Sequence, residues 1–162
     1  MPSSLGHVLE IKHLCMRYPT STNWILDGLR RGDAINMFED VFFTPIHTDV
    51  LAMTVHSLLA SNAKGVFHVV GDEKLSKHDF AIKLAVQFKL SVTSIQKAKL
   101  EEIQLAAIRP RNMALDNQKT RRFLGRKLGS VNEHLEMLHA QETDGRREEL
   151  LVASAVPPNN QG

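Results

Sequence analysis

Cysteine is almost absent from this sequence of 162 residues, and a long apolar run is missing altogether. The single cysteine, Cys15, has no partner for an internal disulfide, which is typical of proteins in a reducing compartment. No apolar run approaches the roughly 20 residues that a membrane-spanning helix needs, and the first residues lack the cationic and apolar regions of a signal peptide. We therefore predict a soluble, cytoplasmic protein with no membrane partner.

An excess of charge of one sign is also missing. The 20 lysines and arginines stand against 18 aspartates and glutamates, and the bases are scattered except around 121–127 and 146–147. A nucleic-acid-binding protein usually has a strongly basic face, and this nearly balanced charge does not indicate one. We therefore predict no nucleic-acid partner. The eight histidines include no HExxH pair and there is no Cys/His cluster, so we predict no metal site.

The sequence patterns of a complete nucleotide-dependent enzyme are absent too. There is no GxGxxG, GxxGxxG or GxxxxGK[ST] loop to hold a nucleotide phosphate, and no GxSxG elbow. The one tyrosine, Tyr18, is followed four positions later by Thr22, so a Tyr/Lys pair on one helix face cannot form. Cys15 and His13 lie two positions apart with nothing to activate the thiol, and an inert cysteine is the better interpretation. We predict no catalytic residue in this chain.

Helical periodicity is clear in several places. It predicts helices over 23–32, 48–60, 76–89, 116–125 and 130–138, with a short helical patch near 99–105. Ser76 with Asp79, and Ser130 with Glu133, have the spacing of N-terminal caps. We expect Thr48 or Asp49 to cap the second helix, and Asp116 and Gly125 to bound the fourth.

Strand signals are shorter. The sequence predicts strands over 34–38 and 65–70, with an edge piece over 41–46 that Pro45 limits, and a weak candidate over 8–16. The glycine-bounded, β-branched run 65–70 is the pattern of a fully buried strand in a mostly parallel sheet, which makes His68 a packed core histidine. Followed by the helix 76–89, this strand is half of a βαβ unit, so the fold class is α/β.

The stretch AIRPRNMALD, residues 107–116, contains the chain's best binding candidate. Pro110 favours an extended shape for Arg109, whose planar guanidinium can meet a phosphate or carboxylate with two hydrogen bonds. Alternatively, Arg109 and Arg111 only form ion pairs with surface acids. Asn112 has the residue type to bond the local backbone of a turn.

Four blocks together resemble one family. They are NWILDGLRRG (23–32), FFTPIHTDVLA (42–52), KGVFHVVGDEKLSKHDFA (64–81) and AIRPRNMALDNQK (107–119). Their order and spacing resemble the C-terminal half of extended short-chain dehydrogenase/reductases of the dTDP-4-dehydrorhamnose reductase type, which also includes the methionine adenosyltransferase regulatory β subunit. The chain departs from the family at Ile46, Val50 and Met113, where a threonine, an acid and a serine are usual.

The resemblance implies an α/β substrate-binding portion that lacks most of the dinucleotide-binding Rossmann half. It implies a poorly defined segment over 1–21 that is a possible remnant strand of that half, a substrate-binding domain over 22–138, and a flexible tail over 139–162. It also implies a nucleotide-sugar substrate, with Arg109, Asn112 and Asn23 as substrate-binding residues. NAD(P) would belong to the complete enzyme, and this chain alone would bind no cofactor.

Three functions remain open from the sequence. The first is the substrate-binding part of a nucleotide-sugar reductase or epimerase that reduces a 4-keto sugar nucleotide with NAD(P), inactive alone and paired with a separate Rossmann half. The second is a non-catalytic regulatory or interaction module that binds a partner protein. The third is an independent α/β domain that resembles the family only in its packing signals.

Overall fold

The computed structural model describes residues 21–102 and 109–145. The helices are α1 (Ser21–Arg31), α2 (Thr48–Ala60), α3 (Lys77–Gln87), α4 (Gln118–Leu124) and α5 (Val131–Thr143), with a 3-10 turn η1 (Leu100–Glu102). The strands are β1 (Ile35–Phe38), β2 (Phe42–Phe43), β3 (Leu75–Ser76) and β4 (Ile95–Ala98). The class is α/β, as predicted.

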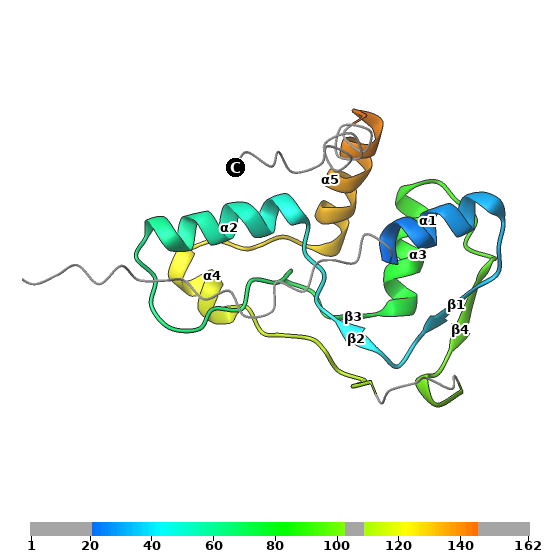
Figure 1. Cartoon of the computed structure of the whole chain (residues 1–162), viewed down its shortest axis with the longest axis horizontal. Coiled ribbons are helices and arrows are strands. Elements are labelled where there is room, and N and C mark those ends of the chain that lie inside the picture. The colour runs from blue at the N-terminus through cyan, green and yellow to red at the C-terminus, as the bar shows by residue number, and fades with distance from the viewer. Residues whose placement is uncertain (1–20, 103–108, 146–162) are drawn as a thin grey trace, which may run out of the picture.

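The strands form two small sheets. β1 and β4 are parallel, in the register Ile35 to Ile95 and Phe38 to Ala98. β2 and β3 are antiparallel, with Phe42 opposite Ser76. Figure 1 shows α1 and α3 beside the β1–β4 pair at one end of the molecule, and α2 and α4 at the other end.

The first end is held by an apolar core, and we call α1, β1, α3, β4 and α5 the apolar region. α3 contributes Phe80, Ala81, Leu84 and Ala85, of which the last three are completely buried. The other members of the core come from neighbouring elements, namely Ile25, Leu26, Leu29, Ile35, Met37, Leu75, Ile95, Val131 and Leu135. Burial of this many aliphatic side chains in one cluster supplies the main driving force for folding.

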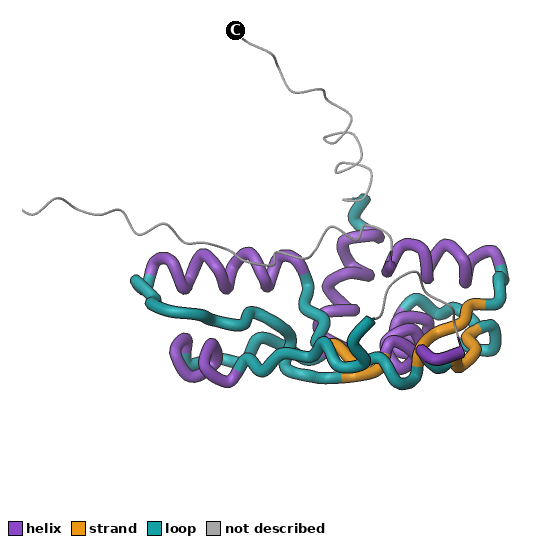
Figure 2. Tube along the Cα trace, turned by 60° about the horizontal axis from the view of Figure 1, so that its bottom comes forward, coloured by secondary structure: helices purple, strands orange, loops and turns teal. Residues whose placement is uncertain are grey.

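The second end is held differently, and we call α2, the segment 61–72 and α4 the polar region. Its completely buried side chains are Thr54 of α2 and Thr120 of α4, and Asn117 just before α4 is 5% exposed. In Figure 2, the segment that lies in space between α2 and α4 is drawn as loop and not as strand. Hydrogen bonds between side chains and backbone therefore add to a smaller amount of apolar packing here.

The predicted helices are confirmed, with small shifts at their ends. Ser76 accepts a hydrogen bond from the Asp79 amide at 3.0 Å, and Ser130 and Glu133 form a complete capping box. The cap of α2 is His47, whose Nδ1 accepts from the Asp49 amide at 3.2 Å, so the prediction of Thr48 or Asp49 was wrong.

Helices α4 and α5 each differ from the prediction at one end. Asn117 stands at the cap position of α4, although the Asp116 carboxylate still accepts from the Gln118 amide at 2.9 Å. Gly125 ends α4 in the left-handed conformation, as predicted. α5 continues to Thr143, beyond the predicted domain end at 138, and there Gln141 donates to the Asp49 carboxylate across the molecule.

The strand prediction for 65–70 was wrong. The segment is a partly exposed loop without ladder pairing, and His68 is exposed rather than part of a core. The parallel pair is instead β1 with β4, which the sequence did not predict as a strand. In β4, Ile95 and Ala98 are buried and the two residues between them are exposed, so the alternation that signals a strand is missing. The weak strand candidate over 8–16 lies outside the described residues.

Candidate functional site

Backbone hydrogen bonds fix the segment from Arg111 to Met113 along β2. The Phe42 amide donates to the Arg111 carbonyl at 2.7 Å, and the Met113 amide donates to the Phe42 carbonyl at 2.9 Å. Asn112 thereby forms a parallel bridge with Phe42. The Leu115 amide donates to Thr44 Oγ1 at 3.2 Å, which holds the next turn of the chain. The position of this stretch therefore depends on β2.

Asn112 has the local role that its residue type predicts. Its side-chain oxygen accepts a hydrogen bond from the Ala114 amide at 3.3 Å, which is an Asx turn. The side chain is otherwise exposed. Asn112 therefore shapes the turn and leaves its amide group accessible at the surface.

Arg109 and Arg111 differ sharply although only Pro110 separates them. Arg111 forms ion pairs with Glu101 at 2.9 Å and Asp40 at 3.5 Å. Arg109 is exposed and forms no ion pair with any residue in 21–102 or 109–145. The surface ion-pair interpretation thus fits Arg111, whereas no acid among the described residues pairs with Arg109.

Two lysines that the sequence analysis missed lie against the same strand. The Lys74 amine lies 4.8 Å from the centre of the Phe42 ring, and the Lys77 amine lies 3.5 Å from that of Phe43. Burial lowers the pKa of Lys77 from its ordinary value of 10.5. Both lysines flank β3, and because β3 is only two residues long, no periodic pattern marked them. With Arg109 they give the neighbourhood of β2 a positive character.

The third predicted site residue, Asn23, is not brought together with the other two. It lies exposed in the first turn of α1, which packs on α3 and β1. In Figure 1 the stretch from residue 109 runs below β2, on the other side of α3 from α1. No contact joins Asn23 to Arg109 or Asn112 within the described parts of the chain.

An aspartate at the centre of the molecule holds the segments next to this stretch. The Asp72 carboxylate accepts from Asn117 Nδ2 at 2.8 Å, from the Leu128 amide at 3.1 Å and from the Gly129 amide at 3.1 Å. Next to it, a Cβ added at Gly71 would overlap the Pro45 carbonyl oxygen, so only glycine fits there. The Gly71-Asp72 pair thus joins α2, α4 and α5.

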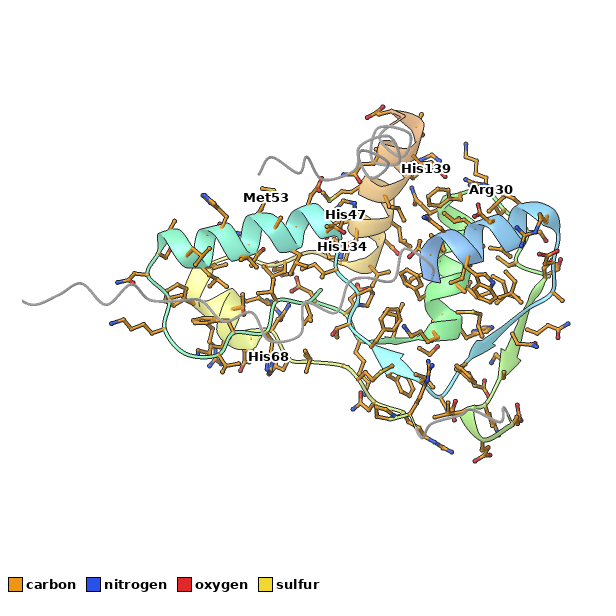
Figure 3. The ribbon with its side chains drawn as sticks, viewed as in Figure 1. Arg30, His47, Met53, His68, His134 and His139 are labelled. Atoms are coloured by element: carbon orange, nitrogen blue, oxygen red, sulfur yellow. The ribbon has the colours of Figure 1, made fainter. Side chains whose placement is uncertain are left out.

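His134 and His68, both drawn in Figure 3, are structural rather than reactive. His134 is 6% exposed and its Nε2 donates to the Leu128 carbonyl at 2.8 Å. His68 Nδ1 lies 3.1 Å from the Asp116 carbonyl oxygen. In the part of the chain that the structure describes, no three His, Cys, Asp or Glu side chains gather closely enough to hold a metal ion. No described helix is long and apolar enough to cross a membrane.

The only parallel strand pair among the described residues has no glycine-rich turn at its carboxyl ends. In α/β folds a pyrophosphate binds beyond the carboxyl ends of parallel strands, on a glycine-rich turn. Here β1 is followed by Glu39-Asp40 and β4 by η1, which carries Glu101-Glu102. Among the described residues at these two strand ends there is no glycine, and Glu39, Asp40 and Glu101 are paired with Lys97 and Arg111.

Comparison with known proteins agrees with this architecture. The curated relative that matches is the probable low-salt glycan biosynthesis reductase Agl14 of Haloferax volcanii, 27% identical over 121 residues, which cover 75% of this chain and 40% of that protein. The dTDP-4-dehydrorhamnose reductase of Bacillus anthracis, solved in complex with NADP, has a TM-score of 0.68 at 21% identity, covering 74% of this chain and 42% of that chain. A hypothetical dTDP-4-dehydrorhamnose reductase from Sulfolobus tokodaii has a TM-score of 0.58 at 23% identity, covering 67% and 38%.

The chain therefore spans about two fifths of the length of the relatives that it matches. The solved structures show that this α/β fold is also found in part of those reductases. The family model described as the RmlD substrate binding domain matches residues 20–143, a range that includes both the apolar region and the polar region. This chain belongs to the RmlD substrate-binding domain family.

Proposed function

We propose that this chain is the substrate-binding part of a nucleotide-sugar reductase and binds a 4-keto sugar nucleotide of the dTDP-4-dehydrorhamnose type. NAD(P), as the hydride donor, would be held by a complementary nucleotide-binding part. In this role Arg109 binds the diphosphate, and Asn112 fixes the turn and offers its amide to the ligand. Asn23 lies apart from these two residues on α1, so the site proposed here does not include it. A cytoplasmic location remains a prediction from the single cysteine.

One observation carries this proposal: Arg109 is exposed and forms no ion pair with the described residues, and the backbone just after it, at Arg111 and Met113, is bonded to β2. A guanidinium group in a defined position can form two parallel hydrogen bonds with a phosphate. Binding then costs less conformational entropy, because the backbone next to it is already ordered. Lys74 and Lys77 add positive charge next to the same strand. This combination suits a diphosphate better than a neutral sugar.

The test compares Arg109→Lys with Arg111→Lys by isothermal titration with dTDP-4-dehydrorhamnose. Lysine keeps the charge but loses the two-pronged geometry, so we expect Arg109→Lys to weaken binding roughly tenfold. Arg111→Lys is the matched control, since Arg111 is already paired with Glu101 and Asp40, and it should leave the affinity unchanged. Equal effects of the two changes would assign Arg109 to the surface ion pairs instead.

A second assay addresses catalysis. The isolated chain should not oxidise NAD(P)H in the presence of dTDP-4-dehydrorhamnose, because it has neither a glycine-rich phosphate loop nor a Tyr/Lys pair. Measurable turnover would disprove the view that the catalytic groups lie elsewhere.

The second candidate function is a non-catalytic interaction module that binds a partner protein. The exposed apolar side chains of the polar region favour it, since Val66 is 75% and Phe123 46% exposed. A partner that co-purifies in equal amount, together with no nucleotide-sugar affinity in the titration above, would select this function over the first.

A further inference from the structure

Four basic residues stand close together in the sequence where α4 ends. They are Arg121 and Arg122 in the last turn of α4, and Arg126 and Lys127 after it, and no acid occurs in 121–127. The chain as a whole is nearly balanced, with 20 bases and 18 acids, so this local excess does not follow from composition. The substrate site proposed above uses none of these four residues.

A turn at Gly125 places the four side chains around one cavity. Gly125 has a φ of 65°, in the left-handed region that favours glycine. The cavity, which we call the basic cavity, has a volume of about 370 Å³ and is lined by Gln118, Arg121, Arg122, Gly125, Arg126 and Lys127. No carboxylate belongs to this lining. The volume lies in the range of small-molecule sites, roughly 300–1,000 Å³. In Figure 1, α4 lies next to α2 at the end of the molecule away from β1 and β4.

Two of the four cations are held in position by neighbouring residues. Arg126 Nη2 donates to Thr54 Oγ1 of α2 at 3.2 Å, and Thr54 is completely buried. Arg121 Nε lies 3.7 Å from the Asp72 carboxylate. Arg122 and Lys127 are exposed, and neither pairs with an acid among the described residues. The basic cavity therefore combines two anchored guanidinium groups with two further cations.

The partial negative charge at the C-terminus of a helix accounts for only part of this arrangement. Cations in the last turn interact favourably with the helix dipole, which explains Arg121 and Arg122. Arg126 and Lys127 lie beyond Leu124, the last residue of α4, and Arg126 is bonded to α2 instead. Like charges around one cavity repel one another, and a bound anion removes that repulsion. A phosphate can also form two parallel hydrogen bonds with each guanidinium group that faces it.

We propose that the basic cavity is a second anion site, separate from Arg109, which binds a compact phosphate compound with several negative charges, such as a diphosphate. The bases surround a cavity and do not extend along a face, which favours a compact anion over a long polyanion. The inference does not depend on the proposed function, because Arg109 does not belong to this lining. An anion bound there connects α4 to α2 through Arg126 and Thr54, and so stabilises the polar region.

Isothermal titration of the full chain with sodium pyrophosphate at low ionic strength tests this proposal. Arg122→Gln together with Lys127→Gln removes the two exposed cations of the basic cavity, so we expect binding to weaken roughly tenfold or more. The charge-matched control is Arg31→Gln together with Lys97→Gln, which removes two exposed cations that have acid partners in the apolar region. This control should leave the affinity unchanged.

Gln118→Glu is a second variant, which keeps all four bases. Gln118 is exposed and lines the basic cavity, so a carboxylate at this position should repel the anion and weaken binding by a similar factor. Thermal unfolding without pyrophosphate verifies that each variant is folded. Added pyrophosphate should raise the melting temperature of the unchanged chain and of the control, but not that of the two cavity variants.

Nuclear magnetic resonance locates the bound pyrophosphate. The amides of 121–127 and of Thr54 should shift on titration, because these residues line the basic cavity or are bonded to it. Arg109→Gln should leave these shifts in place, and any binding at Arg109 would give a separate set of shifts that this variant removes.

Three results of the pyrophosphate titration would overturn the proposal. They are no binding at millimolar concentration, a variant at Arg122 and Lys127 that binds as tightly as the unchanged chain, and an equal loss in the charge-matched control. A fourth is a single-stranded oligonucleotide that binds through Arg122 and Lys127 when pyrophosphate does not, which would assign these bases to an extended polyanion. The proposed function is tested separately, by the titration of Arg109→Lys with dTDP-4-dehydrorhamnose.

Discussion

The two ends of the molecule are stabilised by different forces. In the apolar region, α3 lies on the β1–β4 pair with completely buried aliphatic side chains. In the polar region, α2, the segment 61–72 and α4 are joined by the hydrogen bonds of Asp72, Asn117 and Thr120, and apolar side chains remain exposed. The difference is that aliphatic packing stabilises one end, whereas hydrogen bonds from buried polar side chains hold the other end together.

The largest effect should come from the centre of the apolar region. Leu84→Ala removes a completely buried side chain between the helices and the β1–β4 pair, and should lower the free energy of unfolding by about 2–5 kcal/mol. Val86→Ala on the same helix is the control, since Val86 is 65% exposed and its loss should cost little. Urea denaturation measures both. A small cost for Leu84→Ala would mean that the apolar region does not carry the stability.

An intermediate effect should follow from Asp72→Asn. The amide can supply only one acceptor oxygen and brings its own N–H groups against the donors of Leu128, Gly129 and Asn117, which should cost about 1–3 kcal/mol. Asp116→Asn is the control, because that exposed carboxylate accepts from the single amide of Gln118. If both variants unfold alike in urea, the Asp72 network does not hold the polar region.

A smaller effect is expected for Thr120→Val. Valine keeps the shape of this completely buried side chain but loses the hydrogen bond to the His68 carbonyl, for a cost of about 1 kcal/mol. Hydrogen exchange should show the change in 66–70 and not in α3, because the bond holds only the polar region. Faster exchange in α3 would show that the two regions open together.

The smallest effect concerns acid pH. Hydrogen bonds from Ser130 lower the pKa of Glu133, and the Ser76 hydroxyl lowers the pKa of Asp79. Carboxyl groups with a lowered pKa stabilise the folded state above their ordinary values of 4.5 and 3.8, and this contribution is lost as the pH falls through the folded-state pKa.

Melting temperatures at neutral pH and at about pH 3 should therefore differ less for Glu133→Gln than for the unchanged chain. The variant keeps the acceptor of the capping box but does not titrate. An unchanged pH dependence would show that the capping box makes no measurable contribution.

The contrast between the two ends also explains how much the sequence revealed. Local signals sufficed for the helices, because Ser76 and Ser130 cap them through residues three positions away. β4 was missed because its burial does not alternate. The segment 65–70 was predicted as a strand because of its composition, but a strand also needs a neighbouring strand, and the described residues provide none. The turn at Arg109, Pro110 and Asn112 could be predicted from the sequence. Which of the two arginines forms ion pairs could not, because the acids that pair with Arg111, Asp40 and Glu101, are distant in the sequence.

The backbone of Phe42 has a consequence for the whole domain. On one edge it bonds the stretch that follows Arg109, and on the other it pairs with Ser76, the residue that begins α3. An anion bound at Arg109 is therefore linked through one strand to the helix at the centre of the apolar region. Such linkage is reciprocal. A ligand that orders this turn will also stabilise α3, and a change that destabilises α3 through this strand will lower the affinity for the ligand by the same coupling free energy.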